Sequence, residues 1–124
     1  MFSSAGIYYD KNKKMYFIMN ITYSENRHLR KFFHLHTQYQ AVIYQDVRER
    51  LSYLIINRSD KIKTARQFRC GGLKIYEYKI VAAKDAVFRL AYTYFNDIIN
   101  VIYISQTIIK HQFCKLLEKT DLVD

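Results

Sequence analysis

The chain has 124 residues, with 20 Lys and Arg against 11 Asp and Glu and a formal net charge of +9. This length favours one domain, and the apolar half of the residues argues against disorder. No run of about 18 apolar residues and no basic, apolar leader is present, so we expect a cytoplasmic protein that neither spans nor binds a membrane. Large multidomain enzymes and disulfide-stapled secreted proteins are excluded.

The two cysteines, Cys70 and Cys114, do not have the spacing of a metal site. His34 and His36 are two residues apart, and such residues face different directions on a helix. The sequence therefore predicts free thiols in a reducing compartment, no metal site and no cofactor.

Residues 1–14 have little apolar periodicity and are predicted to be an N-terminal extension, in which Tyr8 and Tyr9 form at most a short accessory strand. Residues 15–124 are predicted to form the single domain. Its first segment, residues 15–23, is rich in β-formers and predicts the first core strand.

Two helices are predicted next. Ser24 or Asn26 is the expected cap of the first helix, because an apolar face of period 3.6 follows. Thr37 and Gln40 fit a capping box at the start of a longer helix over about residues 38–56. Residues 57–72 are then interpreted as a polar connection that ends in the Gly71-Gly72 turn, without the spacing of a nucleotide-binding loop.

Three strands are predicted over residues 73–81, 87–95 and 98–104, with short turns that indicate antiparallel hairpins. Ser105 or Thr107 is the expected cap of a last helix, whose apolar stripe contains Phe113, Leu116 and Leu117. The order β-α-α-β-β-β-α predicts an α+β domain: a small antiparallel sheet with two N-terminal helices packed on one face and a C-terminal helix.

The segments Gly72–Ile80, Phe88–Tyr94 and Val101–Ile104 carry a resemblance to a known family. A Gly-Leu turn opens a core strand, an Arg-aliphatic-small-Tyr element marks the next strand, and an apolar strand leads to a basic C-terminal segment. In this order, and with the helical pair upstream, residues 16–117 resemble the RelE/ParE superfamily of type II toxin–antitoxin toxins, including its HigB-like branch.

The resemblance implies a toxin that inhibits translation as a ribosome-dependent messenger-RNA endonuclease. It also implies three partners: a cognate antitoxin, with which an oligomer is expected, the ribosome and messenger RNA. Two alternatives remain open, because some relatives poison DNA gyrase and others are inactive binding proteins; a fold does not choose among them.

Alternation along the strand at residues 73–81 places Glu77 and Lys79 on one face and Tyr76, Tyr78 and Ile80 on the other, toward the helices. Arg89 of the next strand is expected to join Glu77 and Lys79 on an open concave face. A guanidinium grips phosphate oxygens bidentately, so Arg89 is the predicted phosphate clamp. The alternative is that Arg89 pairs with Glu77 across the hairpin.

The other predicted catalytic residues are Lys79 as a charge stabiliser, His111 as a general acid or base, and Glu77 as a base or a tether. The role of His111 is implied by relatives that use a C-terminal histidine. Glu77 stands where the RelE branch has a basic residue, and no Tyr follows Tyr103. A His/Glu/Arg site and a loss of catalysis therefore both remain open.

Seven Lys and Arg against two Asp and Glu give the segment from Arg58 to Lys79 a net charge of +5. Such a segment matches RNA or an acidic antitoxin, although a solvated loop has the same composition. The predicted RNA-binding residues are Arg66, Arg69, Lys74 and Lys110.

Overall fold

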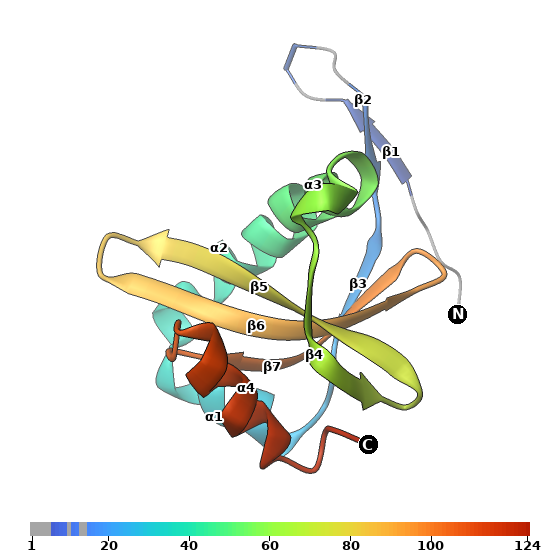
Figure 1. The fold of residues 1–124 in the computed structure, drawn as a ribbon. Coiled ribbons are helices and arrows are strands. Elements are labelled where there is room, and N and C mark those ends of the chain that lie inside the picture. The colour runs from blue at the N-terminus through green and yellow to red at the C-terminus, as the bar shows by residue number, and fades with distance from the viewer. Residues whose placement is uncertain (1–5, 10, 13–14) are drawn as a thin grey trace.

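Five strands form the central sheet in the order β3-β7-β6-β5-β4, and β1 and β2 form a separate two-stranded ribbon (Figure 1). The computed structural model describes residues 6–9, 11–12 and 15–124 and has the predicted α+β class. The strands are β1 (Gly6–Tyr9), β2 (Met15–Ile18), β3 (Asn20–Tyr23), β4 (Lys63–Cys70), β5 (Leu73–Ala83), β6 (Ala86–Phe95) and β7 (Ile98–Ser105). The helices are α1 (Arg27–Leu35), α2 (Gln40–Asp46), α3 (Ser52–Asn57) and α4 (Lys110–Glu118), with short turns η1 (Thr37–Tyr39), η2 (Val47–Leu51) and η3 (Ser59–Lys61).

The central sheet is mixed, which corrects the prediction of an antiparallel sheet. β4 to β7 are antiparallel neighbours, but β3 runs parallel to β7. The strand predicted over residues 15–23 is also divided at Met19 into β2 and β3, which belong to different sheets. Side-chain alternation reports which residues are buried but not which strand lies alongside, so the sequence did not reveal either feature.

The predicted accessory strand at Tyr8 and Tyr9 is confirmed as part of β1. β1 pairs with β2 from Gly6 opposite Ile18 to Tyr9 opposite Met15. This hairpin joins the predicted extension to the first residues of the predicted domain. Residues 1–5, 10 and 13–14 of the extension lie outside the described residues.

The two predicted helices are present, but only one predicted cap is correct. Asn26 caps α1, because its Oδ1 accepts a hydrogen bond from the Leu29 amide at 2.9 Å. Thr37 does not open a capping box: its hydroxyl donates to the carbonyls of Phe33 at 3.1 Å and His34 at 3.3 Å, at the end of α1. The second helix runs from α2 through the π-helical turn η2 into α3 and ends at Asn57.

The predicted connection over residues 57–72 contains a strand, β4, at the edge of the sheet. Lys63 pairs with Glu77 and Arg69 pairs with Lys74, and a β-bulge lies between Thr64 and Arg69. Among the residues of β4, Ala65 alone is fully buried. An edge strand that faces water along most of its length has the composition of a polar loop, which explains the wrong prediction.

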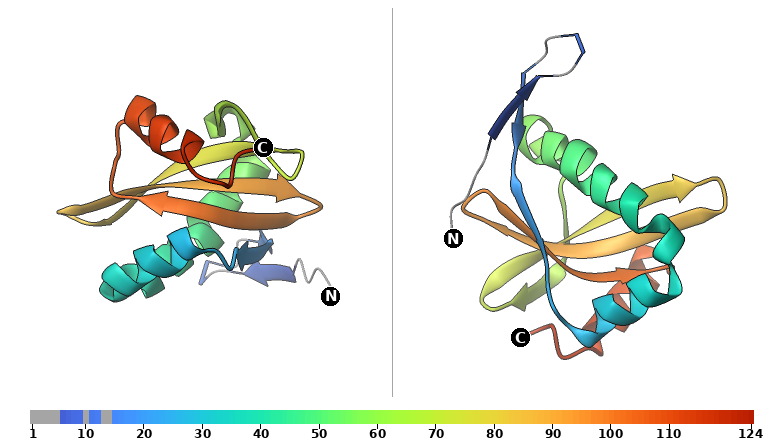
Figure 2. Two further views of the ribbon diagram at one scale, coloured as in Figure 1. Left: turned by 90° about the horizontal axis from the view of Figure 1, so that it is seen from below. Right: turned by 180° about the vertical axis from the view of Figure 1, so that it is seen from behind.

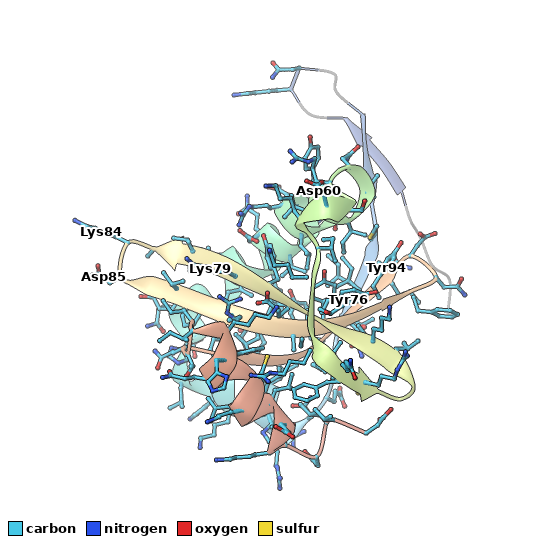
Figure 3. The ribbon with its side chains drawn as sticks, viewed as in Figure 1. Asp60, Tyr76, Lys79, Lys84, Asp85 and Tyr94 are labelled. Carbon is cyan, nitrogen blue, oxygen red and sulfur yellow. The ribbon has the colours of Figure 1, made fainter. Side chains whose placement is uncertain are left out.

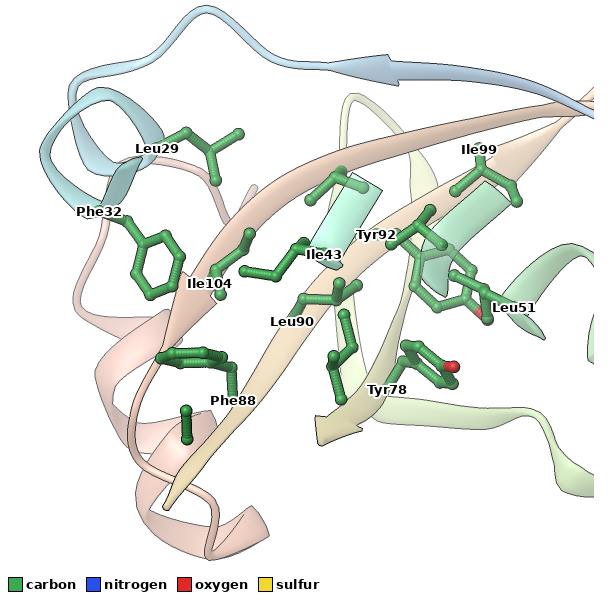
Figure 4. Packing of buried hydrophobic residues seen from close by; sticks show 14 of the residues in the cluster. Leu29, Phe32, Ile43, Leu51, Tyr78, Phe88, Leu90, Tyr92, Ile99 and Ile104 are labelled. Carbon is green, nitrogen blue, oxygen red and sulfur yellow. The ribbon is translucent and has the colours of Figure 1, made fainter. Parts of the chain in front are cut away.

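α4 lies on one side of the sheet and α1 on the other (Figure 2). Each face of the sheet has its own hydrophobic cluster. On one face α1, η2 and the helices beside it cover Tyr78, Ile80, Phe88, Leu90 and Tyr92, as the alternation predicts (Figure 4). On the other face, α4 packs on Ala65, Ile75, Ala91 and Ile102.

The last helix, α4, does not begin at either predicted cap. Its cap position is Ile109, and the Ser105 hydroxyl instead accepts a hydrogen bond from the Thr107 amide at 3.1 Å within the preceding loop. Phe113 and Leu117 are fully buried, as predicted for its apolar stripe, whereas Leu116 is exposed. No helix in the part of the chain that the structure describes is long and apolar enough to cross a membrane.

Candidate functional site

Glu77, Lys79 and Arg89 lie on the face of the sheet that α4 covers. Lys79 is directly opposite Arg89 in the β5–β6 register, and directly opposite residues of two strands share a face. Arg89 Nη1 donates a hydrogen bond to Glu77 Oε2, and Arg89 Nε donates to the Ile108 carbonyl at 2.9 Å. The pairing across the hairpin, the alternative interpretation of Arg89, is therefore present.

The three residues differ in exposure. The Glu77 side chain is 3% exposed and the Arg89 side chain 14%, whereas Lys79 is exposed. The face was expected to be open, but Glu77 is buried there and has Arg89 and Lys110, the first residue of α4, as its ion-pair partners. Lys79 is therefore the member of this group that reaches solvent (Figure 3).

α4 carries two more predicted residues, of which Lys110 contacts this group and His111 contacts Arg66. Lys110 Nζ lies 3.9 Å from Glu77 Oε1, so Glu77 has cations on both sides. His111 Nδ1 lies 2.8 Å from Arg66 Nη2. A guanidinium can only donate, so Nδ1 is the acceptor and the ring proton lies on Nε2.

The backbone conformation of Arg66 explains how a β4 side chain reaches α4. Arg66 lies within the β-bulge and has φ of 54°, in the left-handed region that non-glycine residues rarely adopt. A bulge re-aims a side chain that an unbroken strand would hold elsewhere. The strain at Arg66 and its contact with His111 therefore belong to one local arrangement.

The remaining predicted RNA-binding residues, Arg69 and Lys74, lie on a different surface. They line a pocket of about 370 Å³ on the β4–β5 hairpin. The other lining residues are Thr64, Arg66 and Gln67. Arg66 is shared by this pocket and the contact with His111. We refer to Glu77, Lys79, Arg89, Lys110 and His111 as the α4-face cluster, and to the surface lined by Arg66, Arg69 and Lys74 as the hairpin pocket.

Sequence reasoning missed two neighbours of the α4-face cluster. Lys63 pairs with Glu77 in the β4–β5 register, and the Ile108 carbonyl holds Arg89. Lys63 was counted with the basic segment, but its position depends on β4 being a strand. No sequence signal identifies a loop carbonyl as a partner.

The chemistry available to the α4-face cluster is that of three cations, one carboxylate and one imidazole. Within the described residues, no three His, Cys, Asp or Glu side chains gather at a position that could hold a metal ion. Lys79 is exposed and lies directly opposite Arg89, so its ammonium group can stabilise a negatively charged group that approaches this pair from solvent.

No family model, curated protein or solved structure matches this chain.

Proposed function

We propose that this chain is a RelE/HigB-like toxin that cleaves messenger RNA on the ribosome. The observation that carries the proposal is the meeting of Arg89 of β6 and Lys110 of α4 at Glu77 of β5, with Lys79 opposite Arg89. Beside Lys110 on α4, His111 contacts Arg66 of β4. In this proposal these residues, which are far apart in the sequence, form one phosphate-binding surface. The two helices before the meander and the helix after it also support the proposed family.

The proposed reaction needs no metal ion. The 2′-oxygen of one nucleotide attacks the adjacent phosphorus, the bond from phosphorus to the 5′-oxygen breaks, and a 2′,3′-cyclic phosphate remains. Lys79 and Arg89 stabilise the additional negative charge of the transition state. The Nε2–H group of His111 donates a hydrogen bond to the leaving 5′-oxygen, and water completes its protonation.

Glu77 has a defined place in the same scheme. Its carboxylate is held by Arg89 and Lys110 in the free protein. When the guanidinium turns to a phosphate, Glu77 accepts the proton of the 2′-hydroxyl. The sequence left two roles open for Glu77, a tether for Arg89 and a base. In this scheme Glu77 is the tether before RNA binds and the base after RNA binds.

The test is expression of the chain in a bacterial host, followed by measurement of growth and mapping of messenger-RNA ends. Wild-type chain should arrest growth and create new ends in translated messages. Lys79→Ala should slow cleavage by about 10²-fold or more, the usual effect of removing one stabilising donor. Lys84→Ala is the matched control, because Lys84 is an exposed lysine at the β5–β6 turn, beyond the end of β5 (Figure 3).

Arg89→Ala is a weaker test by itself, because it leaves the buried Glu77 carboxylate without its closest partner. Loss of one member of a buried ion pair typically costs about 3–5 kcal/mol. Thermal unfolding of Arg89→Ala must therefore accompany its cleavage assay. Normal growth and unchanged messenger-RNA ends with the wild-type chain would contradict the proposal.

One observation favours a second function, RNA binding without cleavage. In the structure the Arg89 guanidinium is already engaged by Glu77 and the Ile108 carbonyl. A binding protein would retain RNA affinity and produce no new messenger-RNA ends. A supercoiling assay separates both functions from gyrase inhibition, which predicts loss of supercoiling or trapped DNA breaks.

A further inference from the structure

The hairpin pocket is lined entirely by polar and cationic side chains. Its walls are Thr64, Arg66, Gln67, Arg69 and Lys74, so three cations surround about 370 Å³ and no carboxylate is among the lining residues. A pocket for an apolar ligand or an amphipathic helix is lined mainly by hydrophobic side chains. This lining instead fits a polyanion.

The pocket and the α4-face cluster lie on opposite faces of the sheet. Lys74 pairs with Arg69, and Thr64 pairs with Tyr76. Lys74 and Tyr76 are two residues apart on β5 and therefore share a face, which is the face that packs against α1 to α3. Because β4 is the edge strand, a ligand can pass around it from one face to the other.

Arg66 connects the two surfaces. It lines the hairpin pocket, and its Nη2 lies 2.8 Å from His111 on α4. The bulge and the left-handed conformation of Arg66 place its guanidinium at the edge that separates the faces. The cationic surface is therefore continuous around β4.

The turn beside the pocket already holds an oxyanion. The amides of Gly71 and Gly72 each donate a hydrogen bond of 2.8 Å to one oxygen of the Asp124 carboxylate. Both glycines have positive φ, 58° and 81°, and successive amides in such a turn form an anion-binding concavity. The end of the β4–β5 hairpin is thus suited to negatively charged oxygen atoms.

We propose that the hairpin pocket binds the phosphate backbone of a single RNA strand that passes around β4 from the α4-face cluster. The inference rests on the proposed function, since it extends the RNA from the cleavage site to a second face. An RNA strand is favoured over an acidic peptide because the lining offers guanidinium and ammonium groups without an apolar contact for a side chain.

The experiment measures binding of a fluorescent single-stranded RNA of about 12 nucleotides, a length that spans a typical single-strand site. Lys74→Glu should weaken binding on the order of tenfold at low salt, because it removes one phosphate contact and adds a repulsive charge. Lys84→Glu changes the net charge equally at the opposite end of β5 and should have a much smaller effect. Lys74→Ala should reduce the slope of log affinity against log salt by about 0.7.

Arg66→Asn tests the connecting residue without destabilising the chain. Asn accepts a left-handed conformation better than Arg does, so thermal unfolding should match the wild type while RNA affinity falls. An unchanged RNA affinity in Arg66→Asn would overturn the proposed path around β4.

If Lys74→Glu weakens RNA binding no more than Lys84→Glu does, the proposed pocket is wrong. A labelled oligoglutamate peptide is the comparison ligand, and a larger loss for the peptide than for RNA would identify an acidic-protein site and overturn the proposal. Messenger-RNA cleavage is measured separately. Pocket-dependent RNA binding without cleavage contradicts only the proposed function, whereas cleavage with unaffected Lys74→Glu binding contradicts only this inference.

Discussion

Asp46 is a half-buried carboxylate on the helical face of the sheet, away from the α4-face cluster. The Tyr78 hydroxyl donates to its Oδ1 at 2.5 Å, and Arg50 Nη1 donates to the Tyr78 oxygen at 3.2 Å. Burial raises the pKa of Asp46 above its ordinary value, although the Tyr78 hydrogen bond and the charge of Arg50 oppose the shift. Burial also raises the pKa of the Tyr78 hydroxyl, with the hydrogen bond to Asp46 as a further cause.

The raised pKa of Asp46 predicts a specific pH dependence. Because the folded chain binds this proton more tightly than the unfolded chain, the stability contributed by protonation is complete below about pH 4 and is lost as pH rises through the raised pKa. Asp46→Asn keeps an oxygen for Tyr78 and removes the buried charge. At neutral pH the variant should unfold at the same or a higher temperature than the wild type.

The measurement is thermal unfolding of both proteins from about pH 7 to about pH 4. The stability of Asp46→Asn relative to the wild type should decrease as the pH falls, because protonation relieves the wild-type carboxylate. A variant that is less stable at neutral pH, with a deficit that shrinks on acidification, would show that the ionised carboxylate is stabilising and would contradict the prediction.

At the same scale, Arg89 and Arg66 show the limit of assigning roles to single residues. Alternation correctly placed Arg89 and Glu77 on one face. Arg89 is directly opposite Lys79 in the register, and Lys79 is two residues from Glu77 on β5. Alternation did not reveal that the Glu77 carboxylate is buried or that the Ile108 carbonyl holds Arg89. Arg66 was predicted as an RNA contact, but its link to His111 depends on a bulge that periodicity does not encode.

At the scale of elements, the cap of α1 also fastens that helix to the sheet. Asn26 Oδ1 accepts from the Leu29 amide, and Asn26 Nδ2 donates to the Ile102 carbonyl of β7, each at 2.9 Å. One side chain therefore starts the helix and fixes it against the strand on which Leu29 packs. The sequence predicted the cap but not the bond to β7.

Asn26→Ala should lower the free energy of unfolding by about 1–3 kcal/mol, through loss of the cap and of the carbonyl's partner. Asn57→Ala is the matched control, because the Asn57 amide bonds to the Tyr53 carbonyl at an exposed helix end; its effect should stay within about 0.5 kcal/mol. Urea unfolding monitored by circular dichroism measures both. Equal losses for the two variants would contradict a special role for Asn26.

The second helix also differs from its sequence pattern at the element scale. The predicted helix is present, but η2 widens it into a π-helical turn between Val47 and Leu51, both fully buried. The Ser52 hydroxyl donates to the Val47 carbonyl at 3.2 Å, a bond across five residues that fits the wider turn. The buried side chains of Val47 and Leu51 pack this part of the helix against the sheet. A helical period of 3.6 residues does not predict the π-helical turn between them.

At the scale of the whole molecule, one sheet serves two hydrophobic clusters. α4 closes one face with Phe113 and Leu117, while Ile43 and Leu51 lie within the cluster on the other face. Both clusters use side chains of β5, β6 and β7. Loss of packing on one face therefore weakens strands that the other face needs.

Leu117→Ala should lower the free energy of unfolding by about 2–5 kcal/mol, as expected for a fully buried leucine. Leu116→Ala, on the exposed side of the same helix, should change it by less than about 1 kcal/mol. Because the faces share the sheet, tyrosine fluorescence and circular dichroism should report one coincident transition for both variants. Separate transitions in Leu117→Ala would mean that α4 folds independently of the sheet.

The sequence by itself determined the α+β class, the β5–β6–β7 meander, the helix-facing residues of β5 and β6, and the concentration of positive charge before β5. These features depend on side-chain periodicity and short turns, which are local properties. The direction of β3, the strand β4, the bulge at Arg66 and the burial of Glu77 were decided only by the tertiary structure. Each of these features depends on which distant segment of the chain lies alongside. The same is true of Arg89, whose guanidinium donates to the Ile108 carbonyl in the loop before α4.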